Sequence, residues 1–460
     1  MTRRKYRKGA ALLLSMIVLA VLSAWAASIY SMSGANLQLA ENQRKADHAR
    51  ASAESGLEII RYWLSCIAIA GDTPPNQRFP LIASNFESAA YNTCGIMPSH
   101  DSSSMTVPDI TLNSAMGQNF CAQIIPLPTS TDPNTLQVDV IGICGSVMKT
   151  LRVNYNFGTR RHLAFDYGVA TKGPLHLAGN IELEGANVSV ESDVYIVSEN
   201  ELLALSIIGN SQIAGDVHIA NPLGTVDLQG GQASIGGETV PEAYDHIFAG
   251  APPTEFPVPN PGHFEPYVTN IVDSSTDTTS NATFENIRIV AGTNPTFTGN
   301  VTLNGVVFIE VPNVVTFAGD VTMTGIIAGD GNVEDDSATN QIDFQGNVYS
   351  ASVSELPAEE QFAGLHDEIG TFALAPGFHL AFGGNFGTLN GVIAGNGIEF
   401  SGNAGGTING SVVNYADTTM NLTGNSDLFF NRSGTTEIPA GFVPEIVLNY
   451  EPTSYAEPAL

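Results

Sequence analysis

Hydrophobic residues form one uninterrupted run near the start of the chain. From Ala10 to Tyr30, 21 residues are apolar except for three serines. As a helix rising about 1.5 Å per residue, this run is about 31 Å long, which matches the apolar core of a bilayer. From Ser31 to Cys66 the chain has no proline, and apolar residues recur every three or four positions among charged ones. The pattern predicts one continuous helix over residues 10–65, membrane-spanning at first and amphipathic afterwards.

Alternating segments follow this helix. Hydrophobic residues near 121–125, over 136–144 and over 151–157 take every second position, as in strands with one buried face. A loop rich in Pro, Ser, Thr and Asp separates the first two segments. We therefore expect a small head over residues 66–161, in which a short antiparallel sheet accompanies the long helix. This part of the chain is predicted to have an α+β fold.

The sequence pattern changes from about residue 162, where short β-rich runs are separated by Gly-Asn or Gly-Asp pairs. Several neighbouring pairs are 18 to 22 residues apart, and no helical pattern lies between them. Gly and Asn tolerate the left-handed backbone that tight corners need. A period near 20 predicts a right-handed parallel β-helix of roughly ten coils over 162–438. The pairs begin at Gly179, Gly209, Gly299, Gly319, Gly346, Gly384, Gly402 and Gly424.

Five phenylalanines support the stacked coils, because each stands two residues before one of these pairs. They are Phe297, Phe317, Phe344, Phe382 and Phe400. In stacked coils they would form one aromatic column inside the shaft, worth about 1 kcal/mol per pair beyond area burial. A β-sandwich is the alternative fold, since alternating strands also suit it.

Two insertions and a tail interrupt the repeats. Residues 241–282 form the first insertion, and seven prolines between 241 and 266 exclude a strand ladder there. Residues 355–370 form the second and have the pattern of one short amphipathic helix. Four more prolines after Ile438 predict an extended tail over 439–460.

Charge is distributed unevenly. Residues 1–161 contain 14 Lys and Arg against 10 Asp and Glu, whereas residues 162–460 contain 3 against 36. So acidic a surface repels phosphate backbones, which excludes nucleic acid as a partner of the large C-terminal part. The sequence also has no phosphate-binding Gly-x-x-x-x-Gly-Lys-[Ser/Thr] loop.

The basic residues before the apolar run set its orientation. Five Lys and Arg precede Gly9, which places the N-terminus in the cytoplasm and exports everything after the span. Three interpretations fit: a plain anchor, a secretory signal cut after Ala26, and a prepilin leader cut after Gly9 to leave Ala10 first. The long helix beyond the span favours the third, because a secreted enzyme with a disposable signal needs no such rod.

Three separated stretches resemble the N-terminal domain of PilX-type minor pilins of type IV pili. They are residues 8–15 (KGAALLLS), residues 42–44 (NQR) and residues 53–58 (AESGLE). The resemblance covers about residues 5–65 and implies cleavage by a prepilin peptidase between Gly9 and Ala10, with packing of the helix into a pilus bundle. Major pilins carry Glu at the fifth mature position, where this chain has Leu14. That departure makes it more similar to an accessory or tip subunit.

All four cysteines lie within the head. They are Cys66, Cys94, Cys121 and Cys144. Export to an oxidising compartment predicts two disulfides, and three connectivities are possible. Because Cys121 and Cys144 lie on neighbouring predicted strands, we favour Cys121–Cys144 with Cys66–Cys94. Zinc is disfavoured because neither Cys-x-x-Cys nor a His pair with ligand spacing occurs.

Residues that carry chemistry are sparse in the repeats. No cofactor is expected, and His176, His218 and His379 stand singly. A lyase would need a base, and the three Lys and Arg lie in unrelated coils. Divalent cation binding is the best remaining candidate, since one loop clusters hard oxygen ligands of the kind that Ca²⁺ prefers. Its residues are Asp330, Asn332, Glu334, Asp335 and Asp336.

These patterns together indicate a non-enzymatic subunit of a type IV pilus or a related secretion pseudopilus. It is anchored in the inner membrane of a bacterium with its N-terminus cytoplasmic, and it displays an acidic β-helix outward. Tip location or priming of pilus assembly, with adhesion to carbohydrate or a surface receptor, is the expected role. The expected partners are other pilins or pseudopilins, the prepilin peptidase and membrane lipid. The alternative is a secreted or anchored β-helix enzyme that acts on carbohydrate.

Overall fold

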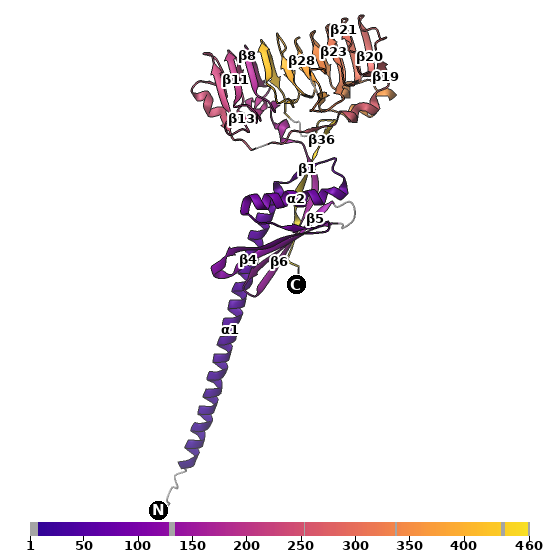
Figure 1. The fold of residues 1–460 in the computed structure, drawn as a ribbon. Helices are drawn as coiled ribbons and strands as arrows, with labels where there is room; N and C mark the ends of the chain where they lie inside the picture. Colours follow the sequence, from indigo (N-terminus) through magenta and orange to yellow (C-terminus); the bar gives the residue numbers. More distant parts are fainter. Residues whose placement is uncertain (1–7, 128–133, 253, 336–337, 434–437, 459–460) are drawn as a thin grey trace, which may run out of the picture. The chain divides into compact units, whose positions relative to one another are not determined.

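The computed structural model describes residues 8–127, 134–252, 254–335, 338–433 and 438–458. The chain divides into two compact units (Figure 1). The helix–sheet unit comprises residues 1–69, 73–158 and 446–460. The parallel-sheet unit comprises residues 70–72 and 159–445. The expected order, a long N-terminal helix followed by a large β-rich region, is confirmed.

One antiparallel sheet and two helices build the helix–sheet unit. The predicted long helix is α1 (Lys8–Ser65), which runs without a break, and a second helix, α2 (Pro75–Cys94), was not predicted. The sheet order is β1-β37-β6-β5-β4-β3-β2. Its strands are β1 (Ala68–Ala70), β2 (Ser99–His100), β3 (Met105–Asn113), β4 (Gln118–Leu127), β5 (Thr135–Cys144), β6 (Val147–Arg160) and β37 (Glu445–Ala456).

The core of this unit lies between the two helices and one face of the sheet. Ala53, Ile60 and Trp63 of α1 are fully buried, and the Trp63 ring meets Phe86 of α2 edge-on at 5.5 Å. Alternate residues of β5, including Val138 and Val140, face the same core. The C-terminal half of α1 is therefore held by hydrophobic burial, which is the dominant favourable term in folding.

The last strand returns to the first unit. β37 lies between β1 and β6, so the sheet of the helix–sheet unit is completed by residues from the end of the chain. Asn154 contacts Ser454, Asn156 contacts Glu451, and Gly158 lies against Asn449, so the two strands run antiparallel. The extended tail predicted over 439–460 is thus mostly a paired strand. The parallel-sheet unit is an insertion between two neighbouring strands of this sheet.

Three sheets form the parallel-sheet unit, and successive turns of the chain contribute a strand to each. The first has the order β17 (Ile247–Ala249), β13 (Val217–Ile219), β10 (Val194–Ile196), β7 (Val169–Thr171), β33 (Val412–Asn414), β30 (Val392–Gly395), β27 (Thr371–Ala375), β24 (Val321–Gly329), β22 (Val301–Ile309), β20 (Ala282–Ile289) and β19 (Asn270–Val272), with β26 (Val348–Ala351) also paired to β24.

The second and third sheets follow the same course. The second has the order β14 (Thr225–Gln229), β11 (Leu203–Gly209), β8 (Leu175–Gly179), β34 (Met420–Gly424), β31 (Ile398–Phe400), β28 (His379–Phe382), β25 (Gln341–Phe344), β23 (Val314–Phe317) and β21 (Thr296–Phe297). The third has the order β16 (Glu238–Thr239), β15 (Ser234–Ile235), β12 (Gln212–Ile213), β9 (Glu182–Gly185), β35 (Asp427–Phe430), β32 (Gly406–Ile408) and β29 (Thr388–Leu389).

Pairing within these sheets is parallel, apart from β15 with β16. The predicted parallel sheets are therefore present, and the antiparallel pairing that the β-sandwich alternative requires is not what these strands show. That the coils form a right-handed β-helix stays a prediction.

The order of the coils differs from the expected one, in which each coil pairs with the next along the chain. The chain enters the stack in the middle at β7, winds to one end at β17 and restarts from the other end at β19. It then winds back until β33 pairs with β7, with Val412 opposite Val169 and Asn414 opposite Thr171. The first and last coils are thus neighbours, and the sequence repeats do not reveal it because similar strands can pair in any order.

The proline-rich insertion is shorter than the predicted 241–282, because β17 and β19 lie within those bounds and pair in the first sheet, and it makes this order feasible. Residues 250–269, the strap, connect β17 to β19, which lie ten strand steps apart along the first sheet. Ten steps span about 48 Å, and 20 extended residues reach about 66 Å. The strap contains β18 (Val258–Pro259), which pairs antiparallel with β36 (Phe442–Val443), and the short turn η5 (Pro261–Tyr267).

The aromatic column is confirmed. Phe297, Phe317, Phe344, Phe382 and Phe400 are buried, and successive rings stack with centroids 5.0 to 5.1 Å apart and planes within 13°.

The Gly-Asn corners also stack, through amide ladders. Asn210 donates to Asn180 at 2.9 Å, and Asn180 donates to Asn425 at 2.8 Å. The ladder thus crosses the junction between the first and last coils.

The short amphipathic helix expected over 355–370 is wrong. Three single turns occupy this region, η6 (Val353–Glu355), η7 (Glu360–Phe362) and η8 (Leu365–Asp367). Pro357 removes a helical donor, and Gly364 has a left-handed backbone with φ 82°. Each break lets one turn bury an apolar side chain, such as Phe362 or Leu365, against the outer face of the first sheet.

Candidate functional site

The N-terminal half of α1 is exposed and apolar. Every side chain from Ala11 to Ala40 is exposed, and the large apolar ones leave at least half of their surface uncovered. The helix is long and apolar enough to cross a membrane. Among the described residues, the first ion pairs along α1 are those of Glu41, which lies 2.9 Å from Arg44 and 3.6 Å from Lys45. A bare apolar surface of this size marks a region that contacts lipid or other helices.

The predicted processing site lies at the start of this helix. Gly9 and Ala10 fall in the first turn of α1, and residues 1–7 of the predicted leader lie outside the described residues. Leu14, at the fifth position after the predicted cut, leaves 66% of its side chain exposed. Cleavage by a peptidase stays a prediction.

Two glycines fix how closely the rest of α1 approaches the sheet. A methyl group on Gly142 of β5 would overlap the Ala49 carbonyl oxygen and the Ala53 amide nitrogen of α1. A methyl group on Gly56 of α1 would collide with the Phe120 ring of β4 at 2.5 Å. The backbones of helix and strand are therefore in direct contact, which anchors the exposed half of α1 rigidly to this unit.

No disulfide joins the four cysteines in this structure, and the expected Cys66–Cys94 pair stays a prediction. All four are free thiols, with Cys66 and Cys94 exposed and Cys144 buried. The predicted Cys121–Cys144 bridge is wrong, because Cys144 shares the buried face of β5 with Val140, whereas Cys121 alternates with the buried Phe120 and points to the other face. Cys121 also pairs with Ile141 rather than with Cys144 in the ladder. Burial raises the pKa of the Cys121 thiol.

The acidic loop turns its polar groups toward its own backbone. Asp330 accepts a hydrogen bond from the Gly331 amide at 2.8 Å, and Asp335 accepts one from the Asn332 amide at 2.7 Å. Asn332 in turn accepts from the Glu334 amide at 2.8 Å, while Asp336 lies outside the described residues. Within the described ranges no group of three potential metal ligands is close enough to hold an ion. The Ca²⁺ candidate gains no support from this geometry.

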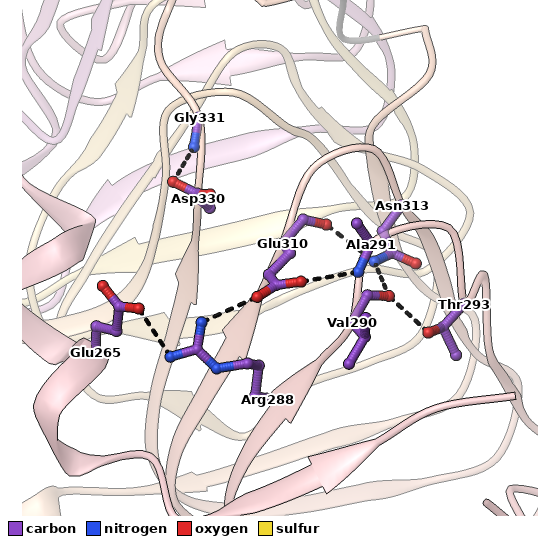
Figure 2. Close-up of polar contacts among 9 residues, drawn as sticks. All are labelled: Glu265, Arg288, Val290, Ala291, Thr293, Glu310, Asn313, Asp330 and Gly331. Atoms are coloured by element: carbon purple, nitrogen blue, oxygen red, sulfur yellow. Dashed lines mark hydrogen bonds and ion pairs between the residues drawn. The ribbon is translucent and has the colours of Figure 1, made fainter. Parts of the chain in front are cut away.

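Close to this loop, Arg288 connects the strap to two coils (Figure 2). Its guanidinium donates to Glu310 at 3.0 Å and to Glu265 of the strap at 2.9 Å. It also covers the Phe308 ring at 5.0 Å. Glu310 accepts a further hydrogen bond from the Ala291 amide at 3.0 Å, and that bond and Arg288 lower the pKa of its carboxyl. The role of this cluster is structural, since Arg288 joins Glu265 of the strap to Glu310 of the next coil.

The histidines of the strands have separate surroundings. His379 lies 3.9 Å from Glu399, and Asn421 pairs with His176 in the strand register. His218 is different, because its ring stacks on Phe248 at 5.2 Å and meets Tyr167 at 5.5 Å. Sequence reasoning missed this aromatic group.

Comparison with known proteins gives the N-terminal helix a family. Residues 8–58 match the family model described as PilX N-terminal. These residues form a PilX-type pilin domain. The match ends inside α1 and covers neither the sheet nor the parallel-sheet unit. No curated protein sequence matches the chain.

Two solved structures are similar to parts of the chain. One is the competence-associated pilin ComZ from Thermus thermophilus, at 10% identity over 89% of this chain and 97% of that chain, with a TM-score of 0.25. The other is an ice-binding protein from the Antarctic ascomycete Antarctomyces psychrotrophicus, at 13% identity over 59% of this chain and 97% of that chain, with a TM-score of 0.19.

Proposed function

We propose that this protein is a minor pilin-like subunit that enters a type IV pilus-related filament at its tip or primes its assembly, and that displays an acidic domain for adhesion. The observation that carries this proposal is the exposed apolar half of α1 within the PilX-type domain. An exposed apolar helix of this length needs lipid to cover its surface before assembly and neighbouring helices to cover it afterwards. The partners are therefore membrane lipid, other pilins or pseudopilins, and the peptidase that cuts after Gly9.

Orientation follows from charge. Five Lys and Arg precede Gly9, so the proposal places them in the cytoplasm and both folded units outside the inner membrane. Exposure to an oxidising compartment would then allow the exposed Cys66 and Cys94 to form a bridge.

We also infer that the stacked coils form a right-handed parallel β-helix. Crossover connections between parallel strands of one sheet are right-handed in nearly all proteins, and each coil makes such a connection. A rigid shaft of this kind suits display rather than catalysis. Two of the few basic residues support this role, because Arg288 is held in ion pairs and Lys172 covers the Phe256 and Tyr415 rings.

Two features favour a tip position. Leu14 cannot neutralise the buried N-terminal amine of a neighbouring subunit, which a Glu at the fifth mature position can do. An unpaired charge inside a helical bundle costs several kcal/mol. In addition, residues 159–445 form a unit that would crowd its neighbours at every repeat of a filament shaft.

Processing provides the first test. Gly9→Val should block the peptidase, because its pocket accepts only a small residue before the cut, and the uncut protein should stay in the inner membrane. Gly9→Ala is the matched control and should still be cut. Mass spectrometry of the mature N-terminus distinguishes them, and a mature chain that begins at Ala27 would contradict the proposal.

Location provides the second test. Antibodies against residues 162–460, detected with gold particles, should label filament ends sparsely. Leu14→Glu should shift some label from the ends to the shaft. Labelling of the unmodified protein at regular intervals along the shaft would refute the tip position.

A further inference from the structure

A row of aromatic side chains lies on the outer face of the first sheet at its β17 end, and a row of polar side chains lies at the corner that leads into these strands. Tyr195, His218 and Phe248 are in register across β10, β13 and β17. The residue two positions before each of them is Asp193, Asp216 and His246, respectively. These three residues lie just before the strands, at the corner of each coil, so a polar row runs beside the aromatic row with its members at the strand spacing of about 4.8 Å.

Contacts hold the aromatic row together. The His218 and Phe248 rings stack at 5.2 Å with 20° between their planes, and Tyr167 meets both Tyr195 at 5.1 Å and His218 at 5.5 Å. The rings are therefore oriented before any ligand arrives.

The polar row is also ordered. Asp193 accepts a hydrogen bond from the Asp216 amide at 2.8 Å, and Asp216 contacts His246 at 2.7 Å. Each carboxylate has a second oxygen that can accept from a hydroxyl group.

The aromatic row ends at an exposed edge of the sheet. β17 is the last strand of its sheet, and within the described ranges no strand pairs with its outer edge. Phe248 leaves 45% of its surface exposed. The strap contacts the row at Tyr195, whose hydroxyl donates to the Pro252 carbonyl oxygen and accepts from the Thr254 amide. Farther along the sheet, buried strap and turn residues such as Phe264 and Phe362 cover the outer face.

The geometry points to a binding site for a neutral glycan, in which a pyranose ring stacks on Phe248 and its hydroxyls donate to the polar row. The C–H face of a sugar carries partial positive charge and complements the negative face of an aromatic ring. Carboxylate acceptors beside the ring match hydroxyl donors. This inference names the ligand class of the adhesion role proposed above and rests on that role.

Charge selects among the occupants of this end. Residues 162–460 carry 36 acidic and 3 basic residues, so the field repels sialic and uronic acids. The same repulsion opposes pairing with a second copy of the chain at this edge. β17 is also only three residues long, which gives an added peptide strand few backbone hydrogen bonds. A neutral polyhydroxylated ligand is not repelled by the acidic surface and does not depend on backbone hydrogen bonds from β17.

Binding by the full-length protein tests this inference. The protein is solubilised in a polyoxyethylene detergent, because the sugar head of a maltoside would compete. The immobilised probes are the neutral oligosaccharides cellotetraose, chitotetraose and lacto-N-neotetraose, with sialylated lacto-N-neotetraose and tetragalacturonic acid as acidic counterparts. At least one neutral probe should bind, at least tenfold more tightly than its acidic counterpart. Phe248→Ala should weaken that binding at least tenfold, and Phe248→Trp should keep it.

Ile271 offers a matched control, because it is 66% exposed on β19, the last strand at the opposite end of the same sheet. Ile271→Ala should leave binding unchanged. Failure of every neutral probe, preference for an acidic one, or unchanged binding by Phe248→Ala would overturn the inference. A concentration-dependent dimer lost in Phe248→Ala, without sugar binding, would also overturn it and identify the face as an interface between copies. None of these results affects processing at Gly9 or labelling of filament ends, which test the proposed function separately.

Discussion

Gly142 shows how one missing side chain sets the distance between helix and sheet. Any Cβ at this position overlaps backbone atoms of α1, and backbone atoms of a buried helix cannot move aside cheaply. Gly142→Ala should therefore destabilise the helix–sheet unit by about 1–3 kcal/mol, the usual cost of overpacking. Thermal unfolding of the full-length protein in detergent measures the loss.

Gly158→Ala is the control for this change. It lies in the same sheet, but its Cβ would meet only the end of the exposed Asn449 side chain, which can rotate away. Its melting temperature should stay near that of the unmodified protein. Equal destabilisation by both variants would show that close contact with α1 is not the cause.

Asp277 gives a prediction about pH. Hydrogen bonds from the Ser280 hydroxyl and from the Thr279 amide and hydroxyl lower its pKa from 3.8 to about 2. A carboxyl with a lowered folded pKa stabilises the fold above its ordinary pKa and loses this effect as pH falls. The unfolding free energy of the unmodified protein minus that of Asp277→Asn should stay constant from pH 7 to about 5. It should shrink between about pH 4 and 2.

Urea unfolding followed by circular dichroism at each pH measures this difference. Thr278→Ala changes a neighbouring residue that does not titrate, so its effect should not depend on pH. An Asp277→Asn effect that is equally flat down to pH 2 would contradict the assigned hydrogen bonds.

The cysteines show what residue-scale patterns can and cannot reveal. Cys144 continues the alternation of Val138 and Val140, whereas Cys121 falls between Phe120 and Ala122. The alternation of side chains along each strand is thus enough to predict that the two thiols face opposite sides of the sheet. It was missed because proximity of strands was considered without the side on which each residue lies.

Among the elements, the phenylalanine column gives the clearest energetic prediction. Phe344 stacks between Phe317 at 5.1 Å and Phe382 at 5.0 Å, and 1% of its side chain is exposed. Phe344→Ala should cost about 3–5 kcal/mol, because the rigid coils cannot collapse into the cavity. Phe344→Leu should cost less, since it refills much of the volume. Chemical denaturation of the parallel-sheet unit measures both losses.

Phe297 provides a comparison at the column's end. It is equally buried but stacks face to face only on Phe317, with Phe284 meeting its edge. Edge-to-face and stacked pairs are each worth about 0.5–1.5 kcal/mol beyond area burial, so Phe297→Ala should cost about as much as Phe344→Ala. A loss at Phe297 that is smaller by about 0.5–1.5 kcal/mol would show that the edge-on contact of Phe284 adds nothing to burial.

Element-scale patterns predicted the column and the long helix because both repeat a local rule. Each phenylalanine precedes its own corner, and α1 has a continuous stripe without proline. The turns at 353–367 escaped prediction because Pro357 and Gly364 interrupt a pattern that is otherwise helical. There, contact with the sheet outweighs local propensity. Helix α2 begins at Pro75 and was not expected.

At the scale of the whole molecule, the parallel-sheet unit is inserted between β6 and β37. Because these strands are antiparallel neighbours, a short Gly-Ser linker in place of residues 159–445 should leave the helix–sheet unit folded. Removal of residues 446–460 from the full chain should instead unfold that unit, because it takes away the buried Ile446 and the ion pair of Arg50 with Glu457 at 3.1 Å. Losing one buried Ile side chain alone costs about 2–5 kcal/mol.

Limited proteolysis in detergent distinguishes the two deletions. The linker variant should resist cleavage over 73–158, and the shortened chain should be cut there. Rapid digestion of the linker variant would mean that the helix–sheet unit depends on its insertion.

Connectivity at this scale was the least predictable feature. Val412 pairs with Val169 just as other valines pair elsewhere in the stack, so the sequence of neither strand identifies the strand with which it pairs. The return of β37 to the first sheet was hidden for the same reason. Asp193, Asp216 and His246 each lie two residues before an aromatic residue, but the three aromatic residues differ in type and are unequally spaced along the chain. The sequence pattern therefore does not reveal the aromatic row.

The pairing of the first coil with the last also governs the order of events as the chain folds. Asn414 bonds to Thr171 across 243 positions, and such distant contacts form late because a long loop must close first. While the chain is incomplete, β7 has one bare edge and the sheet of the helix–sheet unit lacks β37. Both gaps close only when the C-terminal segment arrives. A chain that stops early therefore completes neither unit and carries two open sheet edges that proteases can recognise.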